Sequence, residues 1–491
     1  MKRTSQPESA PREPPLKKVQ LTSDPAEPSI FNQPAPSSTT ASTSRNLELS
    51  TLTVPSPAGW SASAPLFQKP ACIATFSYDE SRTLHHDNRR LNIYHPPPPA
   101  VFDPRANRGR GQMRGPDLNF EYDKWCRRDE TVDEHLDSLL FSLQQKAESG
   151  PVEADRDRAR ADVVTWRGIA TKLCMSVFAD RPQDEWELNV MRVGKTLYLE
   201  EYVSRAERQR KWHSTEQRLL SFQYQGYAFE SWCTSPALPN QGSGGDSVPG
   251  HAAAINARDP PGWGGPVNTN VQWCAVCKTT LGSHRLIIGG EVDCVSRISQ
   301  NSSTSLHRSL IEPDTFIELK TTAEIRGDRD AERLEGNKML RFYYQSFLLG
   351  VPTIVLGFRD RDGYLVDVQE IKTLNLPRIV RNRRHHAEAS KGLAFADQSL
   401  AWISNSITQD GQTVGGSLPD AQEAEKSYPV YRVTFSPTSG GLHNTGTSRL
   451  AIRRLRDEEV LDEIKGGTAE GRVGFLPLSY YSFVRQAPSP S

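Results

Sequence analysis

The chain has 491 residues, and its 59 Lys and Arg residues are balanced by 59 Asp and Glu residues. This balance excludes a protein that coats nucleic acid through an overall basic charge, so any nucleic-acid site must be local. Seven irregularly spaced cysteines argue against a disulfide framework. The longest apolar stretch, residues 346–358, is far short of the ~20 residues that cross a bilayer. We therefore expect a soluble intracellular protein without a membrane partner.

Residues 1–66 are rich in Pro, Ser, Thr and Ala and poor in aromatic residues. Such a segment buries too little apolar surface to offset its conformational entropy, so we expect a disordered N-terminal tail. Two basic pairs in it, Lys2-Arg3 and Lys17-Lys18, loosely match a bipartite nuclear import signal. The alternative is that these charges only keep the tail soluble. We expect a nuclear location, with the cytoplasm as the alternative.

The first part of the folded domain, from residue 67, is predicted to mix strands and helices. β-branched and aromatic residues predict a strand over residues 73–78. Apolar residues at helical spacing predict a helix over 131–147, and a second helix is expected over 162–178. Strands are predicted over 196–203 and 218–227, where aromatic and β-branched residues gather.

Residues 235–266 are dominated by Gly, Pro, Ala and Asn and are predicted to form a flexible insertion. The order that follows, with a helix between strands, favours an α+β fold with mixed β-sheets flanked by helices. The main catalytic domain is expected over residues 67–400, and residues 401–491 are expected to complete the same domain. The elements predicted in this half are strands over 269–276, 286–294, 315–321, 353–358, 364–372 and 430–435, a helix over 331–349 and a loop over 404–427.

Acidic residues recur two positions apart on two of these predicted strands. Residues two apart on a strand share a face, so Glu291 and Asp293 are expected side by side. The same spacing pairs Glu318 with Lys320, with apolar residues on the opposite face. Two adjacent strands of this kind would gather three carboxylates and one ammonium group. The alternative is a solvated strand face, for which such alternation is typical.

Carboxylates this close repel one another unless a cation neutralises them. Ligation by oxygen alone suits Mg²⁺ or Mn²⁺ rather than zinc. Lys320, two residues from Glu318, would be well placed to hold an attacking water or to steady a phosphate. An acid followed by Glu-x-Lys is the pattern of the PD-(D/E)XK nuclease core.

Two further segments extend the pattern. Residues 165–168 place Arg167 before a predicted helix, and Gly226 and Glu230 have the form GxxxE. With the E-x-D and E-x-K pairs they occur in the order found in the DXO family of RNA decapping exonucleases, which the chain resembles. The resemblance spans roughly residues 70–380 and is strongest with the fungal nuclear type, which partners a 5′→3′ exoribonuclease. Residues 77–79, 345–350 and 357–360 add support.

The resemblance implies a role for each matching residue. The implied ligands of Mg²⁺ or Mn²⁺ are Glu230, Glu291, Asp293, Glu318 and the backbone carbonyl of Leu319. The implied catalytic residues are Glu291, Asp293, Lys320 and Gln345, of which Lys320 and Gln345 would contact the nucleophile or the scissile phosphate. Substrate contacts are implied for Arg167, Lys338, Lys320, Gln345 and Glu230. For Arg167 and Lys338 the alternative is an ordinary surface or salt-bridged base.

The activity that the resemblance implies is metal-dependent hydrolysis at single-stranded RNA 5′ ends, in mRNA quality control. The family removes pyrophosphate from 5′-triphosphate RNA and cleaves incomplete, unmethylated and NAD caps. Fungal members also stabilise the nuclear 5′→3′ exoribonuclease. One alternative is a non-catalytic partner of that enzyme, and another is a DNA-repair nuclease.

The spacing Cys274-x-x-Cys277 resembles a zinc knuckle, but two further ligands at suitable spacing are missing from the sequence. We expect both thiols to pack in or beside a strand.

Overall fold

The computed structural model describes residues 48–103, 112–149, 161–213, 217–238, 259–296, 306, 309–381, 388–438, 447–467 and 470–486. These residues belong to one unit of the chain, residues 46–491. The two basic pairs of the predicted import signal lie outside the described residues. Among the helices in these ranges, none is long and apolar enough to cross a membrane.

In the described part of the chain, ten strands form one mixed sheet in the order β1-β18-β17-β8-β9-β7-β12-β11-β2-β3. Parallel pairs join β7 to both of its neighbours, and the remaining pairs are antiparallel. The strands are β1 (Glu48–Thr53), β2 (Phe67–Tyr78), β3 (Leu84–His85), β7 (Val163–Trp166), β8 (Trp186–Val193), β9 (Thr196–Tyr202), β11 (Gln272–Leu281), β12 (His284–Glu291), β17 (Tyr431–Ser436) and β18 (Arg449–Arg454).

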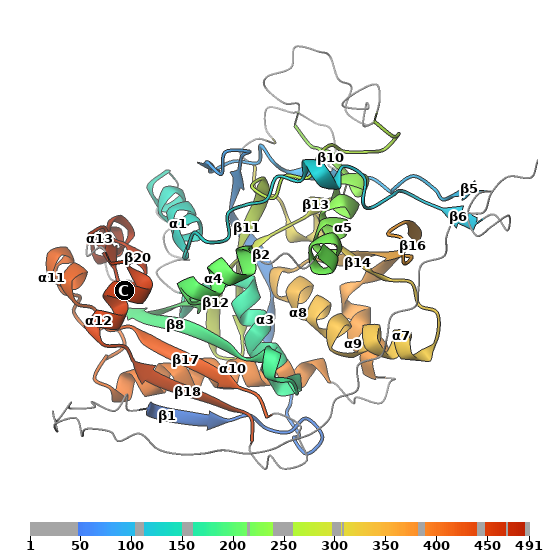
Figure 1. Cartoon of the computed structure of the whole chain (residues 1–491). Helices are drawn as coiled ribbons and strands as arrows, with labels where there is room; N and C mark the ends of the chain where they lie inside the picture. Colours follow the sequence, from blue (N-terminus) through green and yellow to red (C-terminus); the bar gives the residue numbers. More distant parts are fainter. Residues whose placement is uncertain are drawn as a thin grey trace, which may run out of the picture. The chain divides into compact units, whose positions relative to one another are not determined.

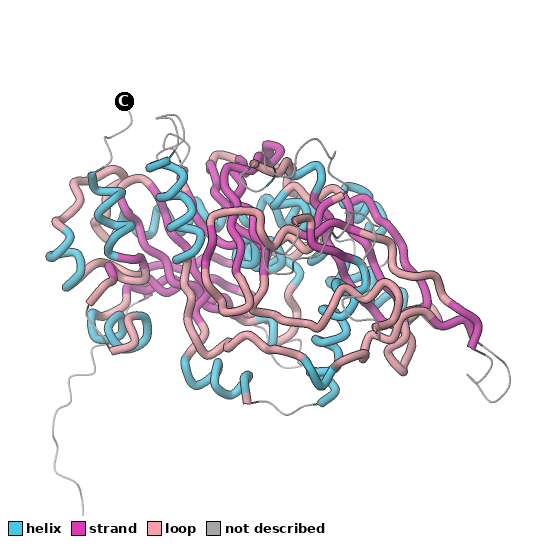
Figure 2. The backbone as a smooth tube through the Cα atoms, turned by 90° about the horizontal axis from the view of Figure 1, so that it is seen from above, coloured by secondary structure: helices cyan, strands magenta, loops and turns pink. Residues whose placement is uncertain are grey.

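Both faces of this sheet are buried, because successive residues of its central strands enter different cores. Val163 belongs to one hydrophobic cluster and Val164 to the other. The first core includes α3 (Arg167–Met175), α8 (Met339–Leu349) and α10 (Ala389–Gln409). The second includes α1 (Asp137–Ser149), α11 (Ala421–Lys426) and α13 (Leu478–Gln486). In Figure 1, β8 and β17 run between α11 and α13 on one side and α10 on the other, and Figure 2 shows helices around the strands from above.

A second sheet has the order β10-β4-β13-β14-β15-β16 among the described strands. Its strands are β4 (Asn92–Tyr94), β10 (Thr234–Pro236), β13 (Cys294–Val295), β14 (Phe316–Ala323), β15 (Thr353–Arg359) and β16 (Leu365–Lys372). Helix α5 (Gln217–Cys233) covers it through a third core that contains Phe229, Ile317 and Leu319. The other elements are hairpins β5–β6 (Val101–Asp103, Gln112–Arg114) and β19–β20 (Arg472–Val473, Leu476–Pro477) and helices α4 (Arg205–Trp212), α7 (Asp328–Arg333), α9 (Leu376–Arg381) and α12 (Asp457–Glu459).

The predicted α+β fold with mixed sheets and flanking helices is confirmed. Several local predictions are wrong. The helix predicted over 131–147 begins only at Asp137. The helix predicted over 162–178 begins with strand β7, and α3 starts at Arg167. The loop predicted over 404–427 contains the end of α10 and all of α11, because Phe395, Ile403 and Ile407 bury a helical stripe.

The predicted N-terminal tail is also corrected in its last third. Glu48–Thr53 forms β1, which pairs antiparallel with β18 at the edge of the large sheet, so order begins before residue 67. Residues 1–47 lie outside the described residues. The predicted insertion 235–266 is structured at both of its ends: β10 pairs with β4, and the Trp263 side chain is fully buried.

Candidate active site

Strand β14 carries Glu318 and Lys320 on the face away from the third core, as the alternation predicted. Their apolar neighbours Ile317 and Leu319 are buried against α5. The Lys320 Nζ lies 2.6 Å from Glu318 Oε1 and 3.8 Å from Asp293 Oδ2. It also donates to the Leu319 carbonyl at 3.1 Å. The ammonium group therefore meets three of the predicted metal-ligand groups.

Arg167 is the second cation of the site. It is the first residue of α3, directly after β7, and its Nη1 donates to Glu318 Oε2 at 2.7 Å. The Glu318 side chain is only 1% exposed, so this is a buried ion pair. Gly290 of β12 allows the close approach, since a Cβ there would lie 3.2 Å from the Arg167 Cβ. Arg167 is therefore not a surface base; its ion pair with Glu318 matches the salt-bridged alternative and also places the side chain in the acidic cluster.

Glu291 and Asp293 reach the cluster by a different route from the one predicted. The strand predicted over 286–294 is broken: Glu291 ends β12 in the large sheet, and Cys294 begins β13 in the second sheet. Asp293 Oδ2 accepts from the Leu319 amide at 2.6 Å, and Glu291 Oε2 accepts from Gln272 Nε2 at 2.9 Å. The two carboxylates are thus held at the junction of the two sheets.

Glu230 comes from α5, where the sequence had predicted a strand over 218–227. That prediction is wrong because the aromatic residues follow a helical period: Tyr224, Ala228 and Trp232 are buried at steps of four. Gly226 and Glu230 are likewise four apart and line the same hollow as Lys320. Within the described residues, no Lys or Arg pairs with the Glu230 carboxylate, which is the least compensated of the four.

The electrostatics of the cluster follow from burial and mutual repulsion. Burial raises the pKa of Glu230 well above its usual range, and Asp293 and Glu291 raise it further. Burial also raises the pKa of Asp293 to about 7. Burial opposes ionisation of Glu318 too, but Arg167 and Lys320 outweigh it and hold the pKa of Glu318 at about 2. With all four carboxyl groups ionised, the two cations would leave two negative charges uncompensated, and the raised pKa values of Glu230 and Asp293 reflect this cost.

These donors fit a hard divalent cation by chemistry. Oxygen ligands suit Mg²⁺, Mn²⁺ or Ca²⁺, and the uncompensated charge attracts a cation. Glu318 Oε1 is buried and receives no hydrogen bond, although Lys320 Nζ is near it. Within the described ranges, no three acidic, His or Cys side chains already converge in a metal-holding arrangement.

The two remaining predicted residues lie on the helix that follows β14 in sequence. The helix predicted over 331–349 divides into α7, a π-helical turn (Leu334–Lys338) and α8. Lys338 Nζ donates to the Thr321 carbonyl and to Thr322 Oγ1, each at 3.1 Å, and lines the hollow beside Lys320. Gln345 of α8 is half-buried, and its amide makes no hydrogen bond among the described residues. Lys338 therefore lies at the site. Gln345 lies on α8 one turn before Leu349, and the Leu349 side chain lies next to Gly290 of β12, the strand that carries Glu291.

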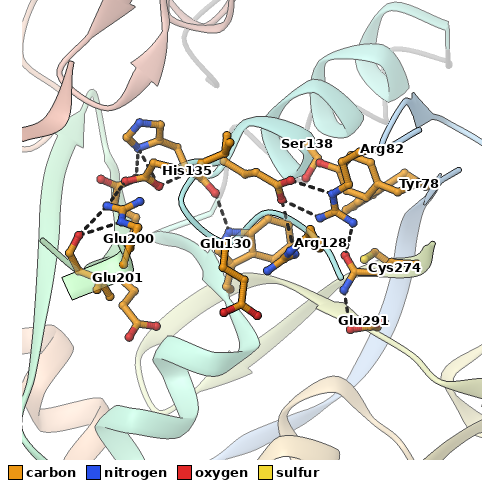
Figure 3. A pocket seen from close by; sticks show the side chains of 18 of the residues that line it. Tyr78, Arg82, Arg128, Glu130, His135, Ser138, Glu200, Glu201, Cys274 and Glu291 are labelled. Carbon is orange, nitrogen blue, oxygen red and sulfur yellow. Dashed lines mark hydrogen bonds and ion pairs between the residues drawn. The ribbon is translucent and has the colours of Figure 1, made fainter. Parts of the chain in front are cut away.

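Three hollows are lined by residues of the acidic cluster. One of 260 Å³ is lined by Lys320, Lys338, Glu230 and aromatic residues. A second hollow, of 420 Å³, is lined by both Glu230 and Glu291. Glu230 also lines the first hollow, and Glu291 also lines the third. The third, of 530 Å³, is shown in Figure 3, where Glu291 lies at one end with Arg82 and Arg128 nearby and His135 and Glu200 at the other. Glu230 and Glu291 therefore connect the cluster to three neighbouring hollows that could take a ligand.

Sequence reasoning missed several residues around Glu291. Gln272 binds Glu291, Arg82 donates to Gln272 at 2.6 Å, and Arg128 lines two of the hollows. The turn at Gly282 could have predicted Gln272, because a hairpin turn fixes the register of the two strands that it joins. In that register Cys274 lies opposite Glu291, and Gln272 is two residues from Cys274 on the same strand. No local signal marks Arg82 or Arg128. The prediction for the cysteines is confirmed, since Cys274 and Cys277 are buried in different cores.

Comparison with known proteins assigns the family. A family model described as RAI1-like PD-(D/E)XK nuclease matches residues 68–463. The decapping nuclease RAI1 of Mycosarcoma maydis is 36% identical over 87% of this chain and 89% of its own length. The decapping and exoribonuclease protein of Xenopus laevis is 32% identical over 72% of this chain and 79% of its own.

Solved structures agree on the fold. Rai1 of Scheffersomyces stipitis, in complex with (3′-NADP)⁺ and calcium, has a TM-score of 0.62 at 20% identity and covers 88% of this chain and 100% of its own. Rai1 of Candida albicans, in complex with pU5 and Mn²⁺, has a TM-score of 0.60 at 19% identity, with 89% and 100% covered. The chain therefore belongs to the RAI1-like family of PD-(D/E)XK nucleases and is a decapping hydrolase.

Proposed function

We propose that this protein hydrolyses phosphate bonds at the 5′ ends of single-stranded RNA with the help of Mg²⁺ or Mn²⁺. The observation that carries the proposal is that Lys320 lies between Glu318 and Asp293, while Glu230 and Glu291 line the hollows beside it. A partner protein without catalysis would have no use for four buried carboxyl groups that only two cations compensate. The resemblance of the four motifs to the decapping family supports the same conclusion.

The residues divide the chemistry between them. Glu230, Glu291, Asp293, Glu318 and the Leu319 carbonyl would hold the divalent ion, which supplies charge neutralisation at the phosphate and activation of the attacking water. Arg167 is fixed by Glu318 and presents its remaining guanidinium donors to phosphate oxygens. Lys320 is placed to steady the charge that develops on the phosphate. Gln345 would contact the nucleophile or the scissile phosphate, and Lys338 would bind the substrate.

We propose three kinds of 5′ end as substrates: 5′-triphosphate RNA, from which pyrophosphate leaves, incomplete or unmethylated caps, and NAD caps. The names of the relatives support decapping, and the pU5 and (3′-NADP)⁺ complexes of two Rai1 proteins support RNA and a dinucleotide as ligands. The process served would be quality control of mRNA 5′ ends.

The experiment compares the purified protein with a Glu291→Ala/Asp293→Ala variant on 5′-triphosphate and unmethylated-cap RNA, with Mn²⁺, Mg²⁺ or EDTA. A matched control is Asp367→Ala/Glu370→Ala, which removes two exposed carboxylates of β16. We expect metal-dependent product release from the wild type and the control and none from the cluster variant. Absence of release on every 5′ end tested would favour a non-catalytic partner protein instead.

We also propose a nuclear location and association with a 5′→3′ exoribonuclease, as the resemblance to the fungal type implies. Affinity purification of the tagged protein from nuclear and cytoplasmic fractions tests both points. We expect the protein in the nuclear fraction with an exoribonuclease bound. Recovery from the cytoplasm alone, without a nuclease, would contradict them.

A further inference from the structure

Arg359 is a half-buried cation without an anionic partner among the described residues. It ends β15 beside Ala323 of β14, and its Nε is buried without a hydrogen bond. Burial lowers its pKa, and no carboxylate acts in the opposite direction. The nearest carboxylates along the chain are engaged elsewhere: Asp360 caps a turn at the Asp362 and Tyr364 amides, and Glu324 binds Arg326. A half-buried guanidinium without a counter-ion is partly desolvated, and an anionic ligand would compensate its charge.

Lys338 is in the same situation and lies nearby. Its Nζ binds only a carbonyl and a hydroxyl, both neutral. Burial, together with Arg359 and Lys320, lowers its pKa to about 8, which places the three cations in one positive region. Lys320 is paired with Glu318 and Asp293 of the acidic cluster, whereas Lys338 and Arg359 form no ion pair among the described residues.

Phe222 of α5 connects Arg359 to the hollow. The guanidinium carbon of Arg359 lies 4.4 Å from the centroid of the Phe222 ring, and this ring lines the 260 Å³ hollow with Lys320 and Lys338. The Phe222 side chain is 39% exposed, which is high for an aromatic residue that the fold does not need for its core. Arg218 also lies over this ring, with its guanidinium carbon 5.5 Å from the centroid. A partly exposed ring that holds cations suits the wall of a phosphate site, because those cations can pair with the phosphate.

We propose that Lys338 and Arg359 form a phosphate site next to the scissile position, with Phe222 as its wall, that receives a second phosphate of the substrate. The inference rests on the proposed function and adds Arg359 and Phe222 to the substrate-binding residues. The phosphate comes either from the RNA chain or from the leaving group. In both cases the ligand is a nucleotide phosphate, which would supply Lys338 and Arg359 with an anionic partner.

The test measures binding rather than turnover. Fluorescence anisotropy with 5′-monophosphate and 5′-triphosphate pentauridylate in EDTA compares the wild type with Arg359→Gln and Lys338→Gln. We expect each variant to bind about 10- to 100-fold more weakly, as for loss of a charged hydrogen bond. The salt dependence should also weaken, with a log–log slope smaller by about 0.7 per lost phosphate contact. Arg326→Gln, a nearby exposed arginine paired with Glu324, is the matched control and should bind normally.

The two RNAs separate the sources of the phosphate. An equal loss for both RNAs assigns the site to a phosphate of the RNA chain, whereas a loss with the triphosphate alone assigns it to the leaving group. Arg359→Lys should recover part of the affinity, because it restores the charge without the forked donors. Unchanged affinity and unchanged salt slope in both glutamine variants would overturn the proposal.

Thermal unfolding excludes a purely structural role. Removal of an uncompensated cation should leave the Tm of Arg359→Gln unchanged or raised, while its RNA affinity falls. A lower Tm with a normal salt slope would assign Arg359 to the fold and refute the site. If Arg359→Gln fails to fold, Lys338→Gln decides on the same criteria. A wild type that binds RNA with the expected slope but releases no product would refute the proposed hydrolysis and leave the phosphate site standing.

Discussion

Replacing Glu230 by glutamine should stabilise the metal-free protein and abolish its response to divalent ions. Glu230 has no cationic partner among the described residues, and Asp293 and Glu291 repel it. Because burial raises the pKa of Glu230, folding at neutral pH must either bury the charge or protonate the carboxyl group, and either costs up to several kcal/mol. An amide left without a partner costs about 1–3 kcal/mol. The difference favours Glu230→Gln by about 1–2 kcal/mol, within the range found for stabilising changes at functional sites.

The divalent ion reverses this order. A ligand present at about 100 times its Kd adds about 2.7 kcal/mol to the free energy of unfolding. The wild type should gain this increment with Mn²⁺ and overtake Glu230→Gln, which lacks one of the predicted ligands. Urea unfolding in EDTA and in Mn²⁺ measures both states, and Glu332→Gln on the exposed face of α7 is the control. Lower stability of Glu230→Gln in EDTA, or an equal gain with Mn²⁺, would refute the reasoning.

Three further predictions concern the structure around the cluster. Arg167→Met leaves Glu318 a partly unpaired buried charge and should lower the free energy of unfolding in urea by about 3–5 kcal/mol. The control, Arg285→Met at the exposed pair with Asp162, should lower it by about 0–1 kcal/mol. Similar losses of stability in the two variants would contradict the buried ion pair. Gly289→Ala places a Cβ 2.6 Å from Leu139 and Trp166 and should cost about 1–3 kcal/mol, while Gly59→Ala, with open space around it, should be neutral. Burial disfavours the charged form of His135, but Glu200 at 2.8 Å outweighs it and raises the pKa of His135. The stability from this pair is therefore fully present below the unfolded pKa of about 6.5 and is lost as pH rises through the higher folded value. Unfolding free energies from pH 6 to 8.5 should fall more steeply in the wild type than in His135→Gln, and parallel curves would contradict the assignment.

The sequence predicted the parts of the site that depend on local periodicity. Glu318 and Lys320 share a face of β14 because side chains alternate along any strand, and this holds wherever the strand lies. Glu291 and Asp293 were predicted to share a face of one strand for the same reason. This prediction is wrong, because β12 ends at Glu291 in the large sheet and the chain then enters the second sheet. Alternation along one strand carries no information about a transfer of this kind.

Other errors came from signals that were present but misinterpreted. In α5, aromatic residues favoured a strand, although Tyr224, Ala228 and Trp232 already repeat every four residues. Strand β1 had no such signal: it is short and polar, and it is held by pairing with β18, about 400 residues later. The sequence also contains no signal for Arg359, because only the packed structure shows that no carboxylate of the described residues lies beside it.

The position of Val292 has a consequence for the spacing of the E-x-D motif. Val292 is buried, and its amide donates to the Trp273 carbonyl at 3.0 Å. It is the one residue between Glu291, at the end of β12 in the large sheet, and Asp293, just before β13 in the second sheet. Two residue steps reach at most about 7 Å, so the motif acts as a fixed-length tether between the sheets. Inserting a residue would lengthen the tether, and both sheets would then keep their strands while losing the common position of their acidic side chains.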